Sequence, residues 1–230
     1  LDLQIFRSLN FSLNLLLSLT VYTVIVGITF ILPFFLEFVK HYPIQEAGLF
    51  MAALPIVTAV VAPISGMLSD RFGERRIGVI GLISLAIGCF AISTFDTQLT
   101  VLGYTIRIFP YGLGIGLFQS PNNSAMLGIL PKNRLSIGSG LLSLSRTLGQ
   151  TIGFSFMGVL FSFLTLRNSQ IANNIDITTA PAASLVYGMR MSFEVVGFIL
   201  VAAIIMAIIL WWYEQRQKAN NPDLLAHTFP

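Results

Sequence analysis

Charged side chains are scarce in this chain of 230 residues, and cysteine and histidine are almost missing. Lys, Arg, Asp and Glu together make up 10% of the residues, whereas hydrophobic residues make up 55%. An ordinary globular domain is about 25% charged. So few charges cannot cover the surface of a soluble fold, and the composition therefore predicts an integral membrane protein. Because the net charge is only +3, we expect no nucleic-acid partner.

The missing residue types also exclude several kinds of chemistry. A single cysteine, Cys89, allows no intrachain disulfide and no cysteine-based metal site. The two histidines, His41 and His227, lie outside the long apolar runs, so no histidine-based metal site or nucleophile is visible. The long runs also contain no HExxH pattern and no paired aspartates. We therefore expect no catalytic residue, no metal, no cofactor and no enzyme activity.

Six apolar segments are long enough to cross about 30 Å of hydrocarbon as helices. We expect spans at about 11–39, 47–68, 77–95, 98–130, 135–166 and 191–213. The polar segment 167–190 is rich in Asn and Thr and is expected to be an extramembrane loop, and 214–230 a cytoplasmic tail. The prediction is an all-α polytopic membrane protein in which the six helices form one bundle. Because the chain begins with Leu1 rather than Met, we expect a fragment or a processed chain.

Basic residues are distributed unequally between the two sides of these spans. Eight lie on the side of the termini, namely Arg7, Arg71, Arg75, Arg76, Lys132, Arg134, Arg216 and Lys218. Three lie on the other side, namely Lys40, Arg167 and Arg190. The positive-inside rule therefore places both termini in the cytoplasm. We expect a plasma membrane, the inner membrane if the source is bacterial.

Polar residues recur along one face of the fourth span. Steps of three or four residues connect Arg107, Tyr111, Gly114, Phe118 and Asn122, and Gln119 lies beside Phe118, which interrupts the polar face. The adjacent glycines of "GLGIG", at 112–116, have no strand–turn–helix context, so they indicate close helix packing rather than nucleotide binding. An arginine at membrane depth usually faces a cavity or a partner.

The fifth span carries a continuous polar stripe, Ser136, Ser139, Ser143, Arg146 and Gln150. Such a stripe either forms hydrogen bonds between helices or lines a water-filled pathway, and the arginine favours the pathway. Gly149 and Gly153 form a G-x-x-x-G pair, which usually indicates helix packing.

The stretch "GMLSDRFGERR", at 66–76, places five charges of both signs within seven positions. Gly66 would let the second span approach a neighbour closely, and Gly73 can adopt the positive φ of a tight turn. Asp70 lies at the carboxyl end of a helix, where an acidic group is unfavourable. We therefore expect an arginine or a helix N-terminus to hold it.

This stretch closely resembles the signature loop of the major facilitator superfamily, G-x-L-x-D-R-x-G-R-[KR]-[KR]. The matching residues are Gly66, Leu68, Asp70, Arg71, Gly73, Arg75 and Arg76. Glu74 departs from the pattern, because a basic residue is common there. The segment "PKNRLSIGSGLLSLSRTLGQTIG", at 131–153, is similar to the penultimate span of the fourteen-span drug/proton antiporters. The resemblance covers nearly the whole chain and implies the C-terminal six-helix half of such a transporter.

The resemblance implies export of amphiphilic small molecules by alternating access, with a proton gradient as the energy source. In that family the proton-carrying acids usually lie in the N-terminal half, which this chain does not contain. The expected partners are the lipid bilayer, the substrate and an N-terminal half, in the same parent chain or in a second subunit. An alternative is a half-size module or scaffold that does not transport and assembles with another six-helix chain.

Two groups of functional residues follow. The signature loop is expected to act as a cytoplasmic latch, formed when the inner side is closed and broken when it opens. The expected wall of the substrate pathway consists of Arg107, Gln119, Asn122, Asn123, Arg146 and Gln150.

Overall fold

The computed structural model describes residues 9–128, 134–169 and 177–220, and every long element within them is a helix. The helices are α1 (Leu9–Phe34), α2 (Ile44–Phe72), α3 (Glu74–Ile92), α4 (Val101–Gly128), α5 (Leu135–Ser169) and α6 (Ala182–Asn220). Two short helices, η2 (Phe35–Val39) and η4 (Ile177–Thr179), follow α1 and precede α6. η2 is a π-helical turn that continues α1 beyond Pro33.

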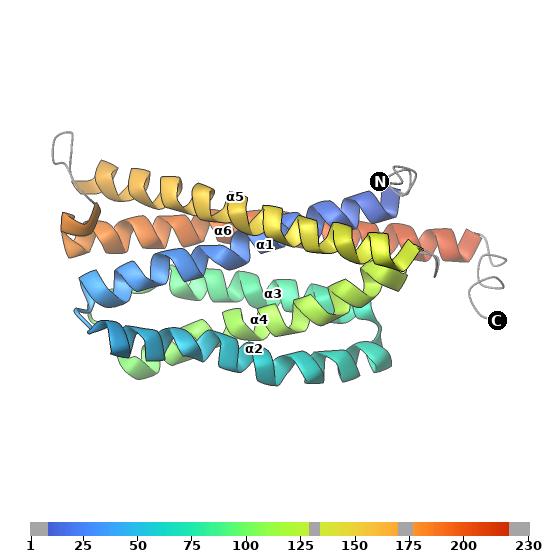
Figure 1. Ribbon diagram of the computed structural model, residues 1–230, viewed down its shortest axis with the longest axis horizontal. Helices are drawn as coiled ribbons and strands as arrows, with labels where there is room; N and C mark the ends of the chain where they lie inside the picture. The colour runs from blue at the N-terminus through green and yellow to red at the C-terminus, as the bar shows by residue number, and fades with distance from the viewer. Residues whose placement is uncertain (1–8, 129–133, 170–176, 221–230) are drawn as a thin grey trace.

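The six helices run side by side along the long axis of the molecule (Figure 1). Each is long and apolar enough to cross a membrane, with candidate spans of 19 to 35 residues. The predicted all-α fold of six membrane-spanning helices is therefore confirmed. Successive helices run in opposite directions, so α1 begins and α6 ends at the same end of the bundle as the connection between α2 and α3 (Figure 1).

The expected boundaries of the loop at 167–190 are wrong. α5 continues to Ser169 and α6 begins at Ala182 rather than at 191. Pro181 directly precedes α6, and its carbonyl accepts hydrogen bonds from the N–H groups of Ser184 (2.8 Å) and Leu185 (3.1 Å). Proline suits the start of a helix because the first N–H groups there need no partner within the helix. The expected end of the fourth span, 129–130, lies outside the described residues.

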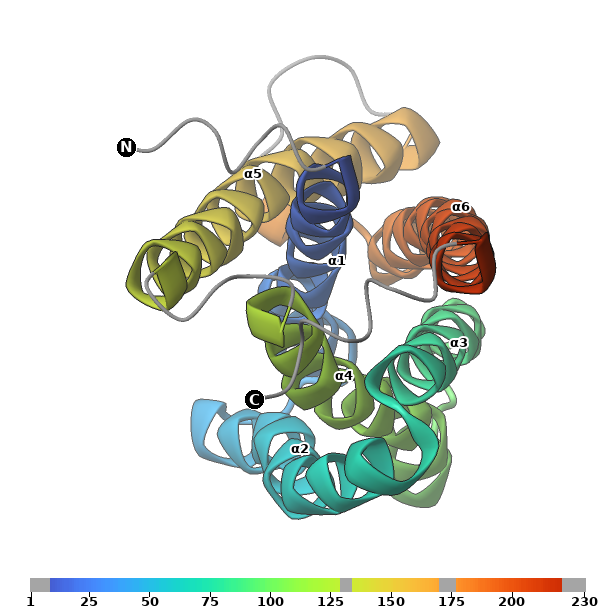
Figure 2. The ribbon, with the colours of Figure 1, turned by 90° about the vertical axis from the view of Figure 1, so that its right-hand side faces the viewer.

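The view along the helices separates them by position (Figure 2). α3 and α6 lie on one side, α5 and α2 lie at the top and bottom, and α1 and α4 lie between them. The glycines of α4 allow its backbone to approach two neighbours. A Cβ atom at Gly114 would lie 2.5 Å from the backbone N of Leu85 in α3, and one at Gly116 would lie 2.8 Å from Val61 in α2. The expectation of close helix packing at 112–116 is confirmed.

The G-x-x-x-G pair of α5 packs against α1 in the same way. A Cβ atom at Gly149 would lie 2.6 Å from the carbonyl oxygen of Leu19, and one at Gly153 would overlap the carbonyl oxygen of Thr23. The expectation for Gly66 is wrong, because the nearest atom to its Cβ position is Ser120 Oγ at 3.9 Å. The close approaches therefore lie along the middle of the helices rather than at the end of α2.

Hydrogen bonds from side chains to backbone carbonyls connect α4 with its neighbours. The buried Tyr111 hydroxyl donates to the carbonyl oxygens of Val24 (3.0 Å) and Ile25 (3.2 Å) in α1. Ser84 Oγ of α3 donates to the Pro110 carbonyl at 2.7 Å, and Ser65 Oγ of α2 donates to that of Leu117 at 3.3 Å. Such polar contacts supply attraction between membrane helices, where lipid tails compete for apolar surface.

We predict that Gly88→Ala destabilises the bundle, whereas Gly78→Ala in the same helix does not. A methyl group at Gly88 would lie 2.6 Å from the backbone N of Tyr111, which cannot rotate away. At Gly78, no atom of another element in the described part of the chain lies within 4 Å of the Cβ position. Overpacking of this kind typically lowers the free energy of unfolding by about 1–3 kcal/mol. Thermal unfolding of the purified protein in detergent checks this, and equal midpoints for the two variants would contradict the close packing of α3 on α4.

Candidate functional site

Gly73 is the single residue between the last residue of α2 and the first of α3. Its backbone has φ +92° and ψ 139°. Positive φ is unfavourable for residues that carry a Cβ atom, so glycine suits this turn. The positive φ expected from the sequence is confirmed, and the turn brings the end of α2 directly onto the start of α3.

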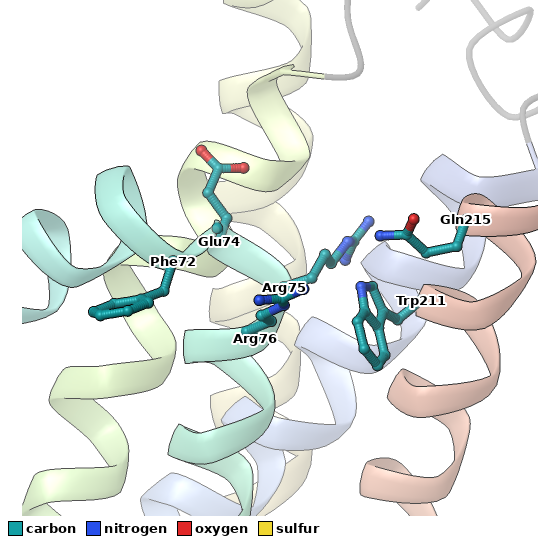
Figure 3. A pocket seen from close by; sticks show the side chains of 7 residues that line it. Phe72, Glu74, Arg75, Arg76, Trp211 and Gln215 are labelled. Carbon is teal, nitrogen blue, oxygen red and sulfur yellow. The ribbon is translucent and has the colours of Figure 1, made fainter. Parts of the chain in front are cut away.

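The three arginines of the signature loop point to three different partners. The Arg71 guanidinium lies 5.3 Å from the centre of the Phe72 ring, within α2. Arg75 Nη1 donates a hydrogen bond to Oδ1 of Asn14, a fully buried residue of α1. The Arg76 guanidinium lies 5.9 Å from the centre of the Trp211 ring in α6 (Figure 3). The loop is thus connected to both α1 and α6.

Asp70 is exposed in the last turn of α2. Within residues 9–128, 134–169 and 177–220 it forms no hydrogen bond and no ion pair, so the expected partner for its carboxylate is not found there. Leu68, by contrast, packs against the cluster of Val61, Ile77 and Leu117 that joins α2, α3 and α4. The carboxylate therefore remains available to a group outside the described part of the chain.

The polar residues of α4 have different environments and do not form one common site. Arg107 Nη1 donates to the carbonyl oxygen of Thr94 at 3.3 Å, just beyond the end of α3. Asn122 is buried and its Nδ2 donates to Ser18 Oγ of α1 at 2.9 Å. Gln119 is half-buried, and Asn123 Oδ1 is buried without a hydrogen-bond partner among the described residues. The expected common face of α4 is therefore mainly a packing face.

The polar stripe of α5 remains largely unburied. Ser136, Ser139 and Ser143 are exposed, and Ser139 Oγ donates to the carbonyl oxygen of Ser136 in the same helix at 3.0 Å. Arg146 and Gln150 are half-buried. In the described part of the chain, no hydrogen bond between helices is found for the four uncharged residues of this stripe, and only Arg146 contacts a polar side chain of another helix, Tyr22 of α1. Interhelical hydrogen bonding within the chain therefore does not explain the stripe.

Arg146 has an aromatic neighbour that sequence reasoning missed. Its guanidinium lies 5.0 Å from the centre of the Tyr22 ring in α1, and its buried Nε has no hydrogen-bond partner among the described residues. A cation near an aromatic face gains electrostatic stabilisation, which is stronger when water is excluded. Tyr22 could not be found from spacing, since it lies in an apolar helix more than a hundred positions away.

A hollow of about 360 Å³ lies between α1, α2 and α4. The lining residues are mostly apolar and small: Ile25, Ile28, Thr29, Leu54, Pro55, Thr58, Ala59, Ala62 and Ile115. Thr58 Oγ1 already donates to the carbonyl oxygen of Gly112 at 3.3 Å, and Thr29 is exposed. None of the six expected pathway residues lines this hollow. Its lining offers apolar contact with a single exposed hydroxyl group.

α2 and α5 are less buried than the other helices. In the most apolar 18-residue stretch of each helix, 17% of α2 and 22% of α5 is buried, against 50% of α3 and α4. A helix with one unburied side needs lipid or another protein surface against it.

Among the described residues no cluster of His, Cys, Asp and Glu could hold a metal ion.

The family model described as "Major Facilitator Superfamily" matches residues 2–154, more than half of the chain. The chain is 29% identical over 202 residues to the riboflavin transporter RibZ of Clostridioides difficile, which is 87% of this chain and 44% of that protein. It is 29% identical over 178 residues to the multidrug export protein EmrB of Escherichia coli, 76% of this chain and 35% of that protein. With the multidrug resistance protein Stp of Mycobacterium tuberculosis the identity is 28% over 166 residues, 72% of this chain and 31% of that protein.

The chain thus spans less than half the length of these curated relatives. The resemblance inferred from residues 66–76 and 131–153 agrees with the matched family and with six helices of membrane-spanning length. This chain belongs to the major facilitator superfamily of membrane transporters.

Proposed function

We propose that this chain forms one half of a transporter that exports amphiphilic small molecules by alternating access, driven by a proton gradient. The observation that carries the proposal is the unburied side of the bundle, where α2 and α5 flank α1 and α4 (Figure 2) and where α1, α2 and α4 line the hollow. In alternating access, one six-helix bundle rocks against another around a midplane site. The other bundle, in the same parent chain or in a second subunit, would cover this side.

The substrate wall that we propose combines the apolar hollow with a polar margin. The margin consists of Gln119, Asn123, Arg146 and Gln150. We leave out Arg107, which is hydrogen-bonded to the Thr94 carbonyl, and Asn122, which is buried and hydrogen-bonded to Ser18. Apolar lining with a few polar groups suits molecules with a hydrophobic body and a polar end. Two relatives are described as multidrug proteins and one as a riboflavin transporter, so relatives of this chain carry different molecules.

The proposed orientation places both termini and the signature loop in the cytoplasm of a plasma membrane. It is supported by the connection between α2 and α3, which lies at the end of the bundle where α1 begins and α6 ends (Figure 1). Arg71, Arg75 and Arg76 belong to the last turn of α2 and the first turn of α3. The alternative of a scaffold that does not transport is less favoured, because the relatives described by function are transport or resistance proteins.

Flux of ethidium into proteoliposomes tests the proposal. The proteoliposomes contain the assembled transporter that includes this chain, and a pH gradient is imposed across their membrane. A flux equal to that of empty liposomes would overturn the proposal.

We predict that Asp70→Asn impairs transport while expression and membrane insertion remain normal. The Asp70 carboxylate is exposed and has no partner in the described part of the chain. In the proposed latch it binds a group on the other half of the transporter, and the neutral amide would weaken that contact. The matched control is Asp96→Asn at the opposite end, where Oδ1 already accepts the Gln98 N–H at 2.8 Å. Ethidium flux should fall on the order of tenfold for Asp70→Asn, which is about 1.4 kcal/mol. Normal flux would reduce the loop to a topology signal.

We predict that Arg146→Gln lowers transport strongly, because the neutral side chain cannot attract an acidic group on the substrate or on the other half. Arg167→Gln in the same helix is the control, since Arg167 is exposed in the last turn of α5. Initial flux at several substrate concentrations is the measurement. If the two variants transported equally well, Arg146 would not belong to the wall.

We predict that Ala59→Trp blocks transport, whereas Val60→Trp does not. Ala59 lines the hollow of about 360 Å³ and a large ring there would fill much of it, whereas Val60 does not line it and is 60% exposed. Size-exclusion chromatography in detergent serves as the control for folding of both variants. Full transport by a folded Ala59→Trp variant would show that substrate does not pass this hollow.

A further inference from the structure

A second hollow of about 360 Å³ lies at the end of the bundle, between the start of α3 and the last turns of α6. The side chains around it belong to the signature loop and to Trp211 and Gln215 (Figure 3). It shares no lining residue with the hollow between α1, α2 and α4. α3 and α6 lie together on one side of the bundle (Figure 2), whereas the hollow of the proposed substrate wall lies between α1, α2 and α4. The second hollow is therefore not part of that wall.

The charges around the second hollow favour an anion. Arg76 is exposed beside the Trp211 ring, and no ion pair joins it to a carboxylate of the described residues. Arg75 extends toward the same space, although its Nη1 also donates to Asn14, and the Gln215 amide faces it. The Glu74 carboxylate points away from the arginines (Figure 3). The hollow is therefore bordered by two arginines and an amide, while the Glu74 carboxylate, which also lines it, is directed away from the arginines.

The surface of α3 beyond Arg76 is apolar. Ile80, Ile83 and Ile87 follow Arg76 at steps of four, three and four residues, so all four side chains lie on one face of α3. The three isoleucines are between 42% and 55% exposed. On α6, Ile208 lies one turn before Trp211 and is also exposed. A positive group thus lies at the end of an apolar stripe about 16 Å long, roughly the depth of one lipid leaflet.

We propose that the second hollow binds the headgroup of an anionic phospholipid, with an acyl chain along Ile80, Ile83 and Ile87. The phosphate lies against Arg76 and close to Arg75, because guanidinium groups match phosphate oxygens in charge and geometry. Basic pockets beside membrane helices commonly hold anionic headgroups. Tryptophan is frequent at the level where headgroups meet hydrocarbon, which is the position of Trp211 near the end of α6.

The same features favour an anionic lipid over the other candidates. A soluble anion would gain nothing from the isoleucine stripe, which only an acyl chain can use. A choline headgroup would bring its own cation to a site bordered by two arginines, and the Trp211 ring already has Arg76 beside it. The inference does not depend on which molecule the transporter carries.

Native mass spectrometry of the assembled transporter that contains this chain tests the proposal. The delipidated protein is titrated with dioleoyl phosphatidylglycerol, with dioleoyl phosphatidylcholine for comparison. We expect saturable binding of phosphatidylglycerol that is at least fivefold tighter than that of phosphatidylcholine. Equal binding of the two lipids would overturn the proposal, as would displacement of phosphatidylglycerol by equimolar glycerol 3-phosphate, which would indicate a site for soluble phosphate.

Two pairs of variants locate the site. Arg76→Gln and Trp211→Leu should each weaken phosphatidylglycerol binding at least fivefold, whereas the matched variants Arg71→Gln and Trp212→Leu should leave it within twofold. Arg71 bears the same charge in the same loop but does not line the hollow, and Trp212 is the exposed neighbour of Trp211. Equal weakening by Arg71→Gln and Arg76→Gln would indicate diffuse electrostatic attraction and overturn the assigned site. Arg76→Lys, which keeps the charge, should bind phosphatidylglycerol more tightly than Arg76→Gln does. This comparison still locates the site if the Trp211→Leu variant does not fold.

Discussion

The close approach of α4 to its neighbours is the constraint on which the rest of the bundle depends. Glycines let the α4 backbone touch α3 at Gly114 and α2 at Gly116, and the Tyr111 hydroxyl reaches two carbonyl groups of α1. In a membrane, apolar side chains gain little by leaving lipid for protein, so such backbone contacts and hydrogen bonds hold helices together. With α4 fixed between three neighbours, α2 and α5 lie at the ends of the bundle, each with one side unburied.

The sequence predicts the helices well because membrane thickness sets their length, and it predicts the glycine contacts because small residues matter only where backbones meet. The sequence does not predict a helix boundary where an uncharged segment could form either a helix or a loop. The residues from Ala182 to Gly188 carry no charge, and only the hydrogen bonds to the Pro181 carbonyl show that α6 already begins there. The positive φ of Gly73 could be inferred because a tight turn between two helices often needs it and glycine adopts it without a steric penalty.

The candidate site was less predictable, because its contacts join residues far apart in the chain. Arg107 lay on the expected polar face, but its position depends on where α3 ends, and it binds the Thr94 carbonyl there. The partner of Arg75 is Asn14, and the neighbour of Arg146 is Tyr22, both in an otherwise apolar α1. The hollow is formed by Thr29, Ala59 and other common residues of three helices, none of which stands out alone. Spacing reveals one face of one helix, whereas these features require two or three helices in register.

Gly73 alone joins α2 to α3, so Asp70 on one side and Arg76 on the other belong to a single short lever. With one residue between the two helices, a displacement of the end of α2 would have little chain length over which to dissipate before it reached the start of α3. In the proposed transporter, the carboxylate assigned to the latch and the guanidinium assigned to the lipid site would therefore move together. The composition of the surrounding membrane would then influence the resting conformation, and two cells with the same transporter but different lipids would start from different populations of its states.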